Sequence, residues 1–370
     1  MGDQEREVAL RIQKFLQAYG ISSELVPISP TRANLVVEIG GEGPVHVWSG
    51  HLDVVASGPA GNWQTPPFEL TEQNGRLYGR GVADMKGSVA AMVLALVQLK
   101  EEGALSHSRL RLLLTADEET GQAGAKALYD QGYMKEAASL FITEPVTGGV
   151  IYSHKGSVNF KLTSRGKMVH SSIPEEGYNA IEPLAWAVGQ LKAYAESLPL
   201  QLPEAGRPVL NCTVFKAGEQ INSLPDLAEA YFNGRTVTQA DHEAMLAKAE
   251  KLVHEANEDG AQLELTVLGE VSPVVTRGAS SLVALTEKLA KQYLGRDISA
   301  LWSPGACDAA SLLPGKPADF PFAVYGFADG NMAHRVDEYC VKADYLKYPE
   351  FLVALMKGLQ EEDLAKPVEV

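Results

Sequence analysis

The stretch VHVWSGHLDVVASG, residues 45–58, joins an apolar run to two chemically active side chains. Its first half is typical of a buried β-strand, because its residues are mostly apolar or small. His51 and Asp53 follow two positions apart, so their side chains can leave an extended chain on the same face. Such a pair can bind a metal through the imidazole while the carboxylate orients the ring. It can equally be a strand-end histidine beside an aspartate that caps a turn.

Further segments place a carboxylate or a histidine after a short apolar run or within a turn. They are GRGVADMKG with Asp84, LRLLLTADEETG with Glu118 and Glu119, LFITEP with Glu144, and GNMAHRVDEY with His334. Each has an ordinary explanation alone, since Asp84 could cap the following helix and the paired glutamates could form an exposed turn. The succession is specific, because carboxylates and imidazoles are ligands of divalent zinc, cobalt or manganese. The sequence therefore predicts a hydrolase with two metals.

The adjacent glutamates can divide two tasks between them. Neighbouring residues generally point in different directions, so Glu118 and Glu119 need not have the same role. One would bind metal, and the other would move a proton to and from the attacking water.

The first part of the chain alternates helical and strand patterns. The patterns predict helices over residues 5–19, 86–102 and 124–131, and strands over 34–41, 45–52, 110–116 and 139–143. This alternation indicates an α/β fold with a mostly parallel sheet flanked by helices. Sites in such sheets gather outside the carboxyl ends of the strands. The candidate ligands lie at these ends.

The middle of the chain follows a different order. Strands are expected over 159–166, 209–218, 227–237 and 261–271, with helices over 179–198 and 240–257. The order β-α-β-β-α-β is typical of a ferredoxin-like α+β unit. We therefore expect a catalytic domain of residues 1–156 and 270–370, with residues 157–269 inserted as a second domain. A helix over 282–293 and a strand over 322–327 then resume the α/β pattern and lead to His334.

Composition restricts the partners and the location of the protein. The 370 residues carry 32 Lys and Arg against 47 Asp and Glu, a net charge of −15. This charge argues against nucleic acid or an anionic membrane as a partner, and an anionic substrate would need a local basic patch. The 3 cysteines lack metal-type spacing, which fits a reducing cytoplasm. No apolar stretch is long enough to span a bilayer, and we expect a cytoplasmic protein.

Together these motifs resemble those of the dizinc amidohydrolases that include succinyl-diaminopimelate desuccinylase, acetylornithine deacetylase, aminoacylase and glutamate carboxypeptidase. The matching segments, in order, are SGHLDVV, GRGVADMKGSVAAM, TADEETG, ITEP, GKMVHSSIPEEGYNAI and AHRVDEY. The similarity extends over nearly the whole chain and is greatest to the desuccinylase-like branch. It implies hydrolysis of an N-acyl amino acid, foremost N-succinyl-LL-diaminopimelate. Acetylornithine deacetylase, aminoacylase and dipeptidase or carboxypeptidase activities are the alternatives.

The resemblance also implies a role for each candidate residue of the catalytic domain. Two divalent metals, foremost zinc with cobalt or manganese as alternatives, would share one carboxylate and have two further ligands each. These ligands are Asp84 as the bridge, His51 and Glu144 at one metal, and Glu119 and His334 at the other. Glu118 would be the general base, and Asp53 would orient His51 without touching metal.

The inserted domain corresponds to a lid, which implies a homodimer formed through it. His170 matches the lid histidine that stabilises the oxyanion and often comes from the other subunit. Asn222 and Arg235 match positions that engage a small-molecule substrate, and Gly305 lies in the loop that lines the pocket. This loop often carries hydroxyl groups in the family, whereas here Gly305 is followed by an alanine and Cys307.

Overall fold

The computed structural model describes residues 4–200 and 202–361, and the chain divides into two compact units. The first comprises residues up to 153, 276–301 and those from 307 onward; the second comprises 154–275 and 302–306. The sequence placed Gly305 with the catalytic domain, but its segment groups with the second unit. One reason is local pairing, since the main-chain amide of Lys155 donates to the carbonyl of Ser303 at 3.0 Å.

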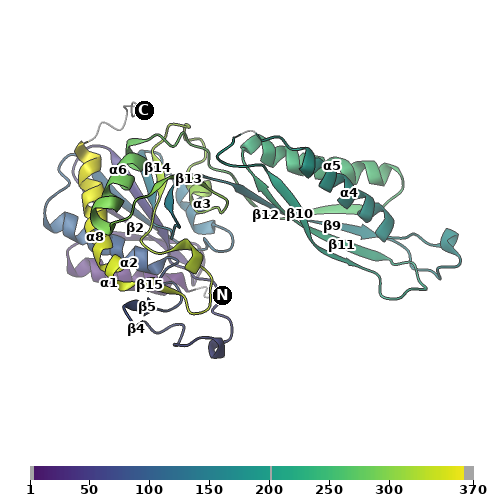
Figure 1. The fold of residues 1–370 in the computed structure, drawn as a ribbon, viewed down its shortest axis with the longest axis horizontal. Helices are drawn as coiled ribbons and strands as arrows, with labels where there is room; N and C mark the ends of the chain where they lie inside the picture. Colours follow the sequence, from purple (N-terminus) through teal and green to yellow (C-terminus); the bar gives the residue numbers. More distant parts are fainter. Residues whose placement is uncertain (1–3, 201, 362–370) are drawn as a thin grey trace. The chain divides into compact units, whose positions relative to one another are not determined.

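An eight-stranded sheet forms the centre of the first unit (Figure 1). In spatial order its strands are β1 (Ser23–Pro27), β2 (Ala33–Gly40), β6 (Arg109–Thr115), β3 (Val45–His51), β7 (Ala137–Ile142), β14 (Phe322–Val324), β8 (Gly149–His154) and β13 (Ser299–Ser303). The four strands β6, β3, β7 and β14 are parallel, which confirms the predicted α/β fold. The pairs β1–β2, β2–β6 and β14–β8 are antiparallel, a feature that the sequence patterns did not predict. All of β3 is buried, as expected for a strand covered on both faces.

Helices cover both faces of this sheet (Figure 1). One group consists of α1 (Glu5–Ala18), α2 (Lys86–Glu101), α6 (Ser281–Leu289) and α8 (Lys342–Glu361). The short helices α3 (Ala123–Asp130) and α7 (Ala309–Leu312) pack against each other. Within the described part of the chain, no helix combines the length and the hydrophobicity that crossing a membrane would require.

Helix α2 approaches the centre of the sheet closely at Gly50. A Cβ atom on Gly50 would lie 2.7 Å from Cε of Met85 and 2.9 Å from Cε of Met92. A larger residue at this position would therefore require both methionine side chains to move. Since Met85 directly follows Asp84, this contact brings that carboxylate to the end of β3.

A separate three-stranded sheet joins two distant parts of the first unit. Its strands are β4 (Thr71–Gln73), β5 (Arg76–Tyr78) and β15 (Tyr339–Val341). Strand β15 pairs antiparallel with β5, with Tyr339 opposite Tyr78. The segment that follows His334 is thereby fixed beside the segment that leads to Asp84.

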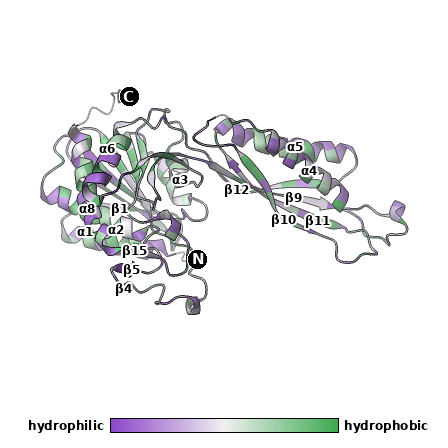
Figure 2. Ribbon diagram, in the orientation of Figure 1, coloured by the Kyte–Doolittle hydropathy of each residue, from purple (hydrophilic) through white to green (hydrophobic). Residues whose placement is uncertain are grey.

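The second unit has the predicted ferredoxin-like order. Its elements are β9 (Gly156–Arg165), α4 (Ile181–Ser197), β10 (Val209–Ala217), β11 (Leu227–Thr236), α5 (Gln239–Glu258) and β12 (Leu263–Val271). The antiparallel sheet has the order β10-β11-β9-β12, and its core includes Phe160 stacked on Phe232 at 4.8 Å between ring centroids. Figure 2 shows hydrophobic and hydrophilic residues alternating along α4 and α5, as expected for helices with one buried face. We refer to this unit as the lid.

Candidate metal centre

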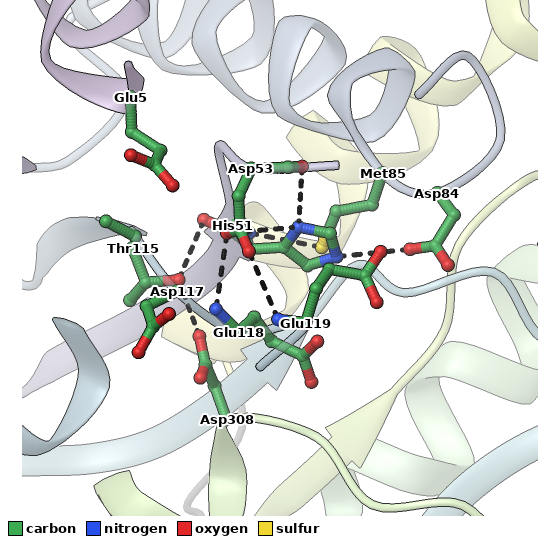
Figure 3. A network of polar contacts seen from close by, with 12 residues as sticks. Glu5, His51, Asp53, Asp84, Met85, Thr115, Asp117, Glu118, Glu119 and Asp308 are labelled. Carbon is green, nitrogen blue, oxygen red and sulfur yellow. Dashed lines mark hydrogen bonds and ion pairs between the residues drawn. The ribbon is translucent and has the colours of Figure 1, made fainter. Parts of the chain in front are cut away.

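Three adjacent parallel strands bring four of the predicted site residues to one edge of the large sheet. His51 ends β3, Glu118 and Glu119 follow the end of β6, and Glu144 follows the end of β7. In the sheet, β3 lies between β6 and β7, so their carboxyl ends meet. Figure 3 shows His51 and both glutamates of the β6 turn in one network of polar contacts. The expectation that the candidate ligands gather at strand ends is met for these residues.

Asp84 lies between the two histidines that the sequence singled out. Its Oδ1 is 3.1 Å from Nε2 of His51, and its Oδ2 is 3.3 Å from Nε2 of His334. His51 Nε2 also lies 3.4 Å from Oε1 of Glu144, and His334 Nε2 lies 2.8 Å from Oε2 of Glu119. Each histidine thus faces one oxygen of Asp84 and one glutamate.

The donor set fits a divalent metal centre. Ligand atoms of His51, Glu118 and Glu144 lie within 4.8 Å of one another, and so do those of His51, Asp84 and Glu119. Oε1 of Glu119 is buried and has no hydrogen-bond partner among the described residues. An uncompensated buried carboxylate oxygen is costly, and a cation would satisfy it. Nitrogen and carboxylate ligands of this kind suit zinc, and also cobalt or manganese.

The pKa values of Glu144, Glu118 and His334 also favour a cation among these side chains. Burial, together with the negative charge of Asp84, raises the pKa of Glu144 to about 8. Burial and the charge of Glu144 raise the pKa of Glu118 well above its usual range. Hydrogen bonds with Asp84 and Glu119 raise the pKa of His334 to about 10. A bound divalent cation would oppose these shifts, because it stabilises ionised carboxylates and binds neutral imidazole.

Asp53 supports the site differently from the sequence prediction. Its carboxylate Oδ1 is 3.7 Å from Nδ1 of His51, which is longer than a hydrogen bond. The main-chain carbonyl of Asp53, at 3.1 Å, contacts that nitrogen instead. The carboxylate accepts hydrogen bonds from the main-chain amides of Glu118 at 3.2 Å and Glu119 at 3.1 Å. Asp53 therefore orients His51 through its backbone and the paired glutamates through its side chain.

A second carboxylate holds the same turn from its other side. Asp117 has a positive φ of 73°, an uncommon conformation for a residue other than glycine. Its side chain accepts hydrogen bonds from Nη1 of Arg32 at 2.7 Å and from the amide of Ala123 at 3.2 Å. Arg32 also pairs with the buried Glu5 at 2.6 Å, which extends the network to α1. The turn that presents Glu118 is thus fixed by groups that the sequence patterns did not reveal.

The segment after Gly305 contributes two further buried groups. Asp308 accepts a hydrogen bond from Thr115, the last residue of β6, at 2.5 Å (Figure 3). Burial raises the pKa of Asp308 to about 7, and burial with the charge of Glu144 keeps the Cys307 thiol neutral by raising its pKa. The sequence singled out Cys307 only as a departure from the hydroxyl groups of the family's pocket loop, and Asp308 belongs to no apolar run or recognisable spacing that would have indicated its role.

Comparison with known proteins assigns the chain to a family. The sequence profile of the peptidase family M20/M25/M40 matches residues 47–358. The chain belongs to this family. It is 37% identical, over 97% of its length and 94% of the relative, to a Staphylococcus aureus protein named "Probable succinyl-diaminopimelate desuccinylase". It is 34% identical to a Pasteurella multocida "Acetylornithine deacetylase" over 60% of the chain and 59% of that relative.

Solved structures of the M20 family share the fold. The carboxypeptidase Sso-CP2 of Sulfolobus solfataricus has a TM-score of 0.80 at 18% identity, covering 96% of this chain and 94% of its own. A tripeptidase of Staphylococcus aureus has a TM-score of 0.79 at 20% identity, covering 97% and 94%. As an M20 protein, the chain is a metal-dependent hydrolase of amide bonds, which confirms the enzyme class predicted from the motifs.

The four residues expected to meet substrate in this M20 protein all belong to the lid unit. His170 pairs with Ser223 in an isolated bridge, and the next amide, of Ser171, donates to the carbonyl of Asn222 at 3.0 Å. His170 and Asn222 are therefore neighbours. Asn222 precedes the first residue of β11, whereas Arg235 lies near its last residue. Gly305 is exposed in segment 302–306.

Proposed function

We propose that the protein hydrolyses N-succinyl-LL-diaminopimelate to LL-diaminopimelate and succinate, using two zinc ions, with cobalt or manganese as alternatives. The observation that carries this substrate is the 37% identity to a "Probable succinyl-diaminopimelate desuccinylase" across 97% of the chain. The similarity to an acetylornithine deacetylase covers 60% of the chain. Deacetylase, aminoacylase and dipeptidase activities are the alternatives, since they would use the same metal centre.

We assign the proposed ligands from the contacts around Asp84. It would bridge the metals, with His51 and Glu144 holding one and Glu119 and His334 the other, as their pairwise contacts suggest. When bound, the metals would lower the pKa of a water molecule and polarise the amide carbonyl. The side chain of His334 is 54% exposed, so substrate can approach this side of the centre.

Glu118 is the proposed general base. Its amide is fixed by Asp53, which leaves its side chain among the proposed ligands. Glu118 would take a proton from the attacking water and deliver it to the leaving amine, which is too basic to depart unprotonated.

His170 is the proposed oxyanion donor, and its tautomer supports this role. Its Nδ1 accepts a hydrogen bond from the main-chain amide of Ser172 at 3.1 Å. An amide can only donate, so the neutral imidazole carries its proton on Nε2. Nε2 can then donate to a developing oxyanion, and losing one such donor typically costs about 100- to 1,000-fold in rate.

Arg235 is proposed to bind a substrate carboxylate together with Lys155. Burial and the positive charge of Arg235 lower the pKa of Lys155, so the two cations lie close to each other. They form the local basic patch that a dianionic substrate needs in a protein of net charge −15.

The geometry of the lid supports a homodimer. Arg235 lies eight positions after Leu227, where β11 begins near the segment of His170, and a strand rises about 3.3 Å per residue. The resulting distance of roughly 26 Å exceeds the length of the proposed substrate. We therefore propose that one active site uses Arg235 of one copy and His170 of another. Light scattering should give twice the mass of the chain, and a monomeric mass at assay concentrations would count against this arrangement.

The proposed reaction is tested by amine release from two substrates in parallel. Metal-loaded protein should release amine from N-succinyl-LL-diaminopimelate and not from N-acetylornithine, and a chelator should stop the reaction. Turnover of the acetyl substrate alone would replace the desuccinylase assignment with a deacetylase. Inactivity on both, with two metals bound, would indicate a peptidase or aminoacylase and call for a panel of dipeptides.

A further inference from the structure

The carboxylate of Glu338, which is outside the proposed ligand set, forms hydrogen bonds with the backbone of the turn that carries Asp84. Glu338 is fully buried and accepts hydrogen bonds from three main-chain amides of this turn. The donors are the amides of Gly81 at 3.0 Å, Ala83 at 2.8 Å and Asp84 at 3.0 Å. Nη1 of the buried Arg80 completes the set, at 2.7 Å. Charge-assisted hydrogen bonds of this kind are the strong ones in proteins.

Glu338 also belongs to the segment that carries His334. The main-chain carbonyl of Glu338 accepts from the amide of Gly79 at 3.1 Å, which continues the pairing of β15 with β5. One residue therefore connects two loops that are distant in sequence, through its backbone to one and through its side chain to the other. These loops supply Asp84 and His334, whose side chains meet at 3.3 Å.

We propose that Glu338 is a positioning residue of the metal centre, which sets the place of the Asp84 carboxylate relative to His334. This proposal rests on the assignment of Asp84 as the bridging ligand. Metal sites tolerate only about 0.2 Å of variation in ligand distance, so a small shift of the turn would misplace Asp84 at both metals. Without an acceptor, three buried amides would lack partners, and the turn would relax to find others.

The test separates the hydrogen bonds of Glu338 with the three amides from its ion pair with Arg80. Arg80→Met removes the ion pair and leaves the carboxylate on the three amides, where it is a buried charge without a cationic partner; urea unfolding measures the stability that this costs. The double variant Arg80→Met with Glu338→Met removes the acceptor as well, without leaving an unpaired buried charge. A third protein, Arg80→Met with Glu338→Gln, returns a neutral carbonyl acceptor to the amides. Metal-free samples of each full chain are titrated with Zn²⁺ and Co²⁺, and binding is followed by equilibrium dialysis and by the visible spectrum of Co²⁺.

We expect Arg80→Met to bind both metals nearly as tightly as the natural protein. The Arg80→Met/Glu338→Met protein should bind them about 10- to 100-fold more weakly, the usual effect of removing a group that orients a ligand. The glutamine variant should fall between these two. Urea unfolding of the metal-free proteins measures any general loss of stability separately.

Equal metal affinity in Arg80→Met and Arg80→Met/Glu338→Met would overturn the proposal, as would an equally large loss in both. If the methionine double variant does not fold, the glutamine double variant replaces it, and affinity equal to that of Arg80→Met would overturn the proposal. Failure of the natural protein to bind two metals would instead contradict the proposed metal centre. None of these measurements depends on the identity of the substrate.

Discussion

Glu118→Ala should abolish amide hydrolysis while both metals remain bound. General acid–base catalysis typically contributes about 100- to 10,000-fold, and we expect turnover to fall by at least that much. Metal binding should persist because the contacts of His51, Glu144, Asp84, Glu119 and His334 with one another do not involve Glu118. Metal analysis of the purified variant, beside a turnover assay, measures both properties.

The neighbouring glutamate provides the matched control. Glu119→Ala removes a carboxylate 2.8 Å from Nε2 of His334, so this variant should lose affinity for one metal. The two variants differ by one position and should fail for different reasons. Loss of metal from Glu118→Ala would make Glu118 a ligand instead, a role that its closeness to His51 and Glu144 permits. An active Glu118→Ala protein would exclude it as the base.

Asp84→Asn should weaken the binding of both metals at once. Although burial opposes its ionisation, hydrogen bonds with His334 and His51 lower the pKa of Asp84, so the natural side chain is a carboxylate. An asparagine keeps the shape but loses the charge and one oxygen. Metal contributions to catalysis are several kcal/mol, so turnover should fall by at least roughly 100-fold at a fixed metal concentration. Metal titration and turnover at several zinc concentrations measure the effect.

Asp308→Asn is the control for this change. Asp308 is also buried, but its hydrogen bond is with Thr115, and it is not among the proposed ligands. The variant should keep both metals. If Asp84→Asn also bound two metals with natural affinity, the bridging assignment would be wrong.

The parts of the fold that sequence predicted are those whose signal is local. Residues 45–51 form a buried run, and so do residues 112–115 of the neighbouring strand, so both strands were visible as patterns. The direction in which strands pair depends on distant partners. The antiparallel position of β2 beside β6 could not be derived from either segment, because its register joins Leu35 to Leu114 through the packing of the whole sheet.

The proposed metal ligands likewise have a local signal in the sequence, whereas the residues that hold them in place do not. His51 ends an apolar strand and Glu119 lies in the turn after another, so their residue types and positions were enough to single them out. Glu338 and Asp308 act on residues 258 and 193 positions away, respectively. Glu338 contacts a guanidinium and main-chain amides, and Asp308 contacts a hydroxyl. Such contacts produce no regular spacing of residue types in the sequence. Support groups of this kind become visible only when the chain is folded.

The pairing of Glu5 with Arg32, and of Arg32 with Asp117, has a practical consequence for work on the purified protein. These ion pairs connect the first helix to the turn that presents Glu118, although more than a hundred positions separate them in sequence. A chain shortened past Glu5, or one whose fused tag disturbs the start of α1, would change the support of the general base. Its lower activity would then be mistaken for a weak enzyme, so the choice of the first residue belongs among the variables of any kinetic comparison.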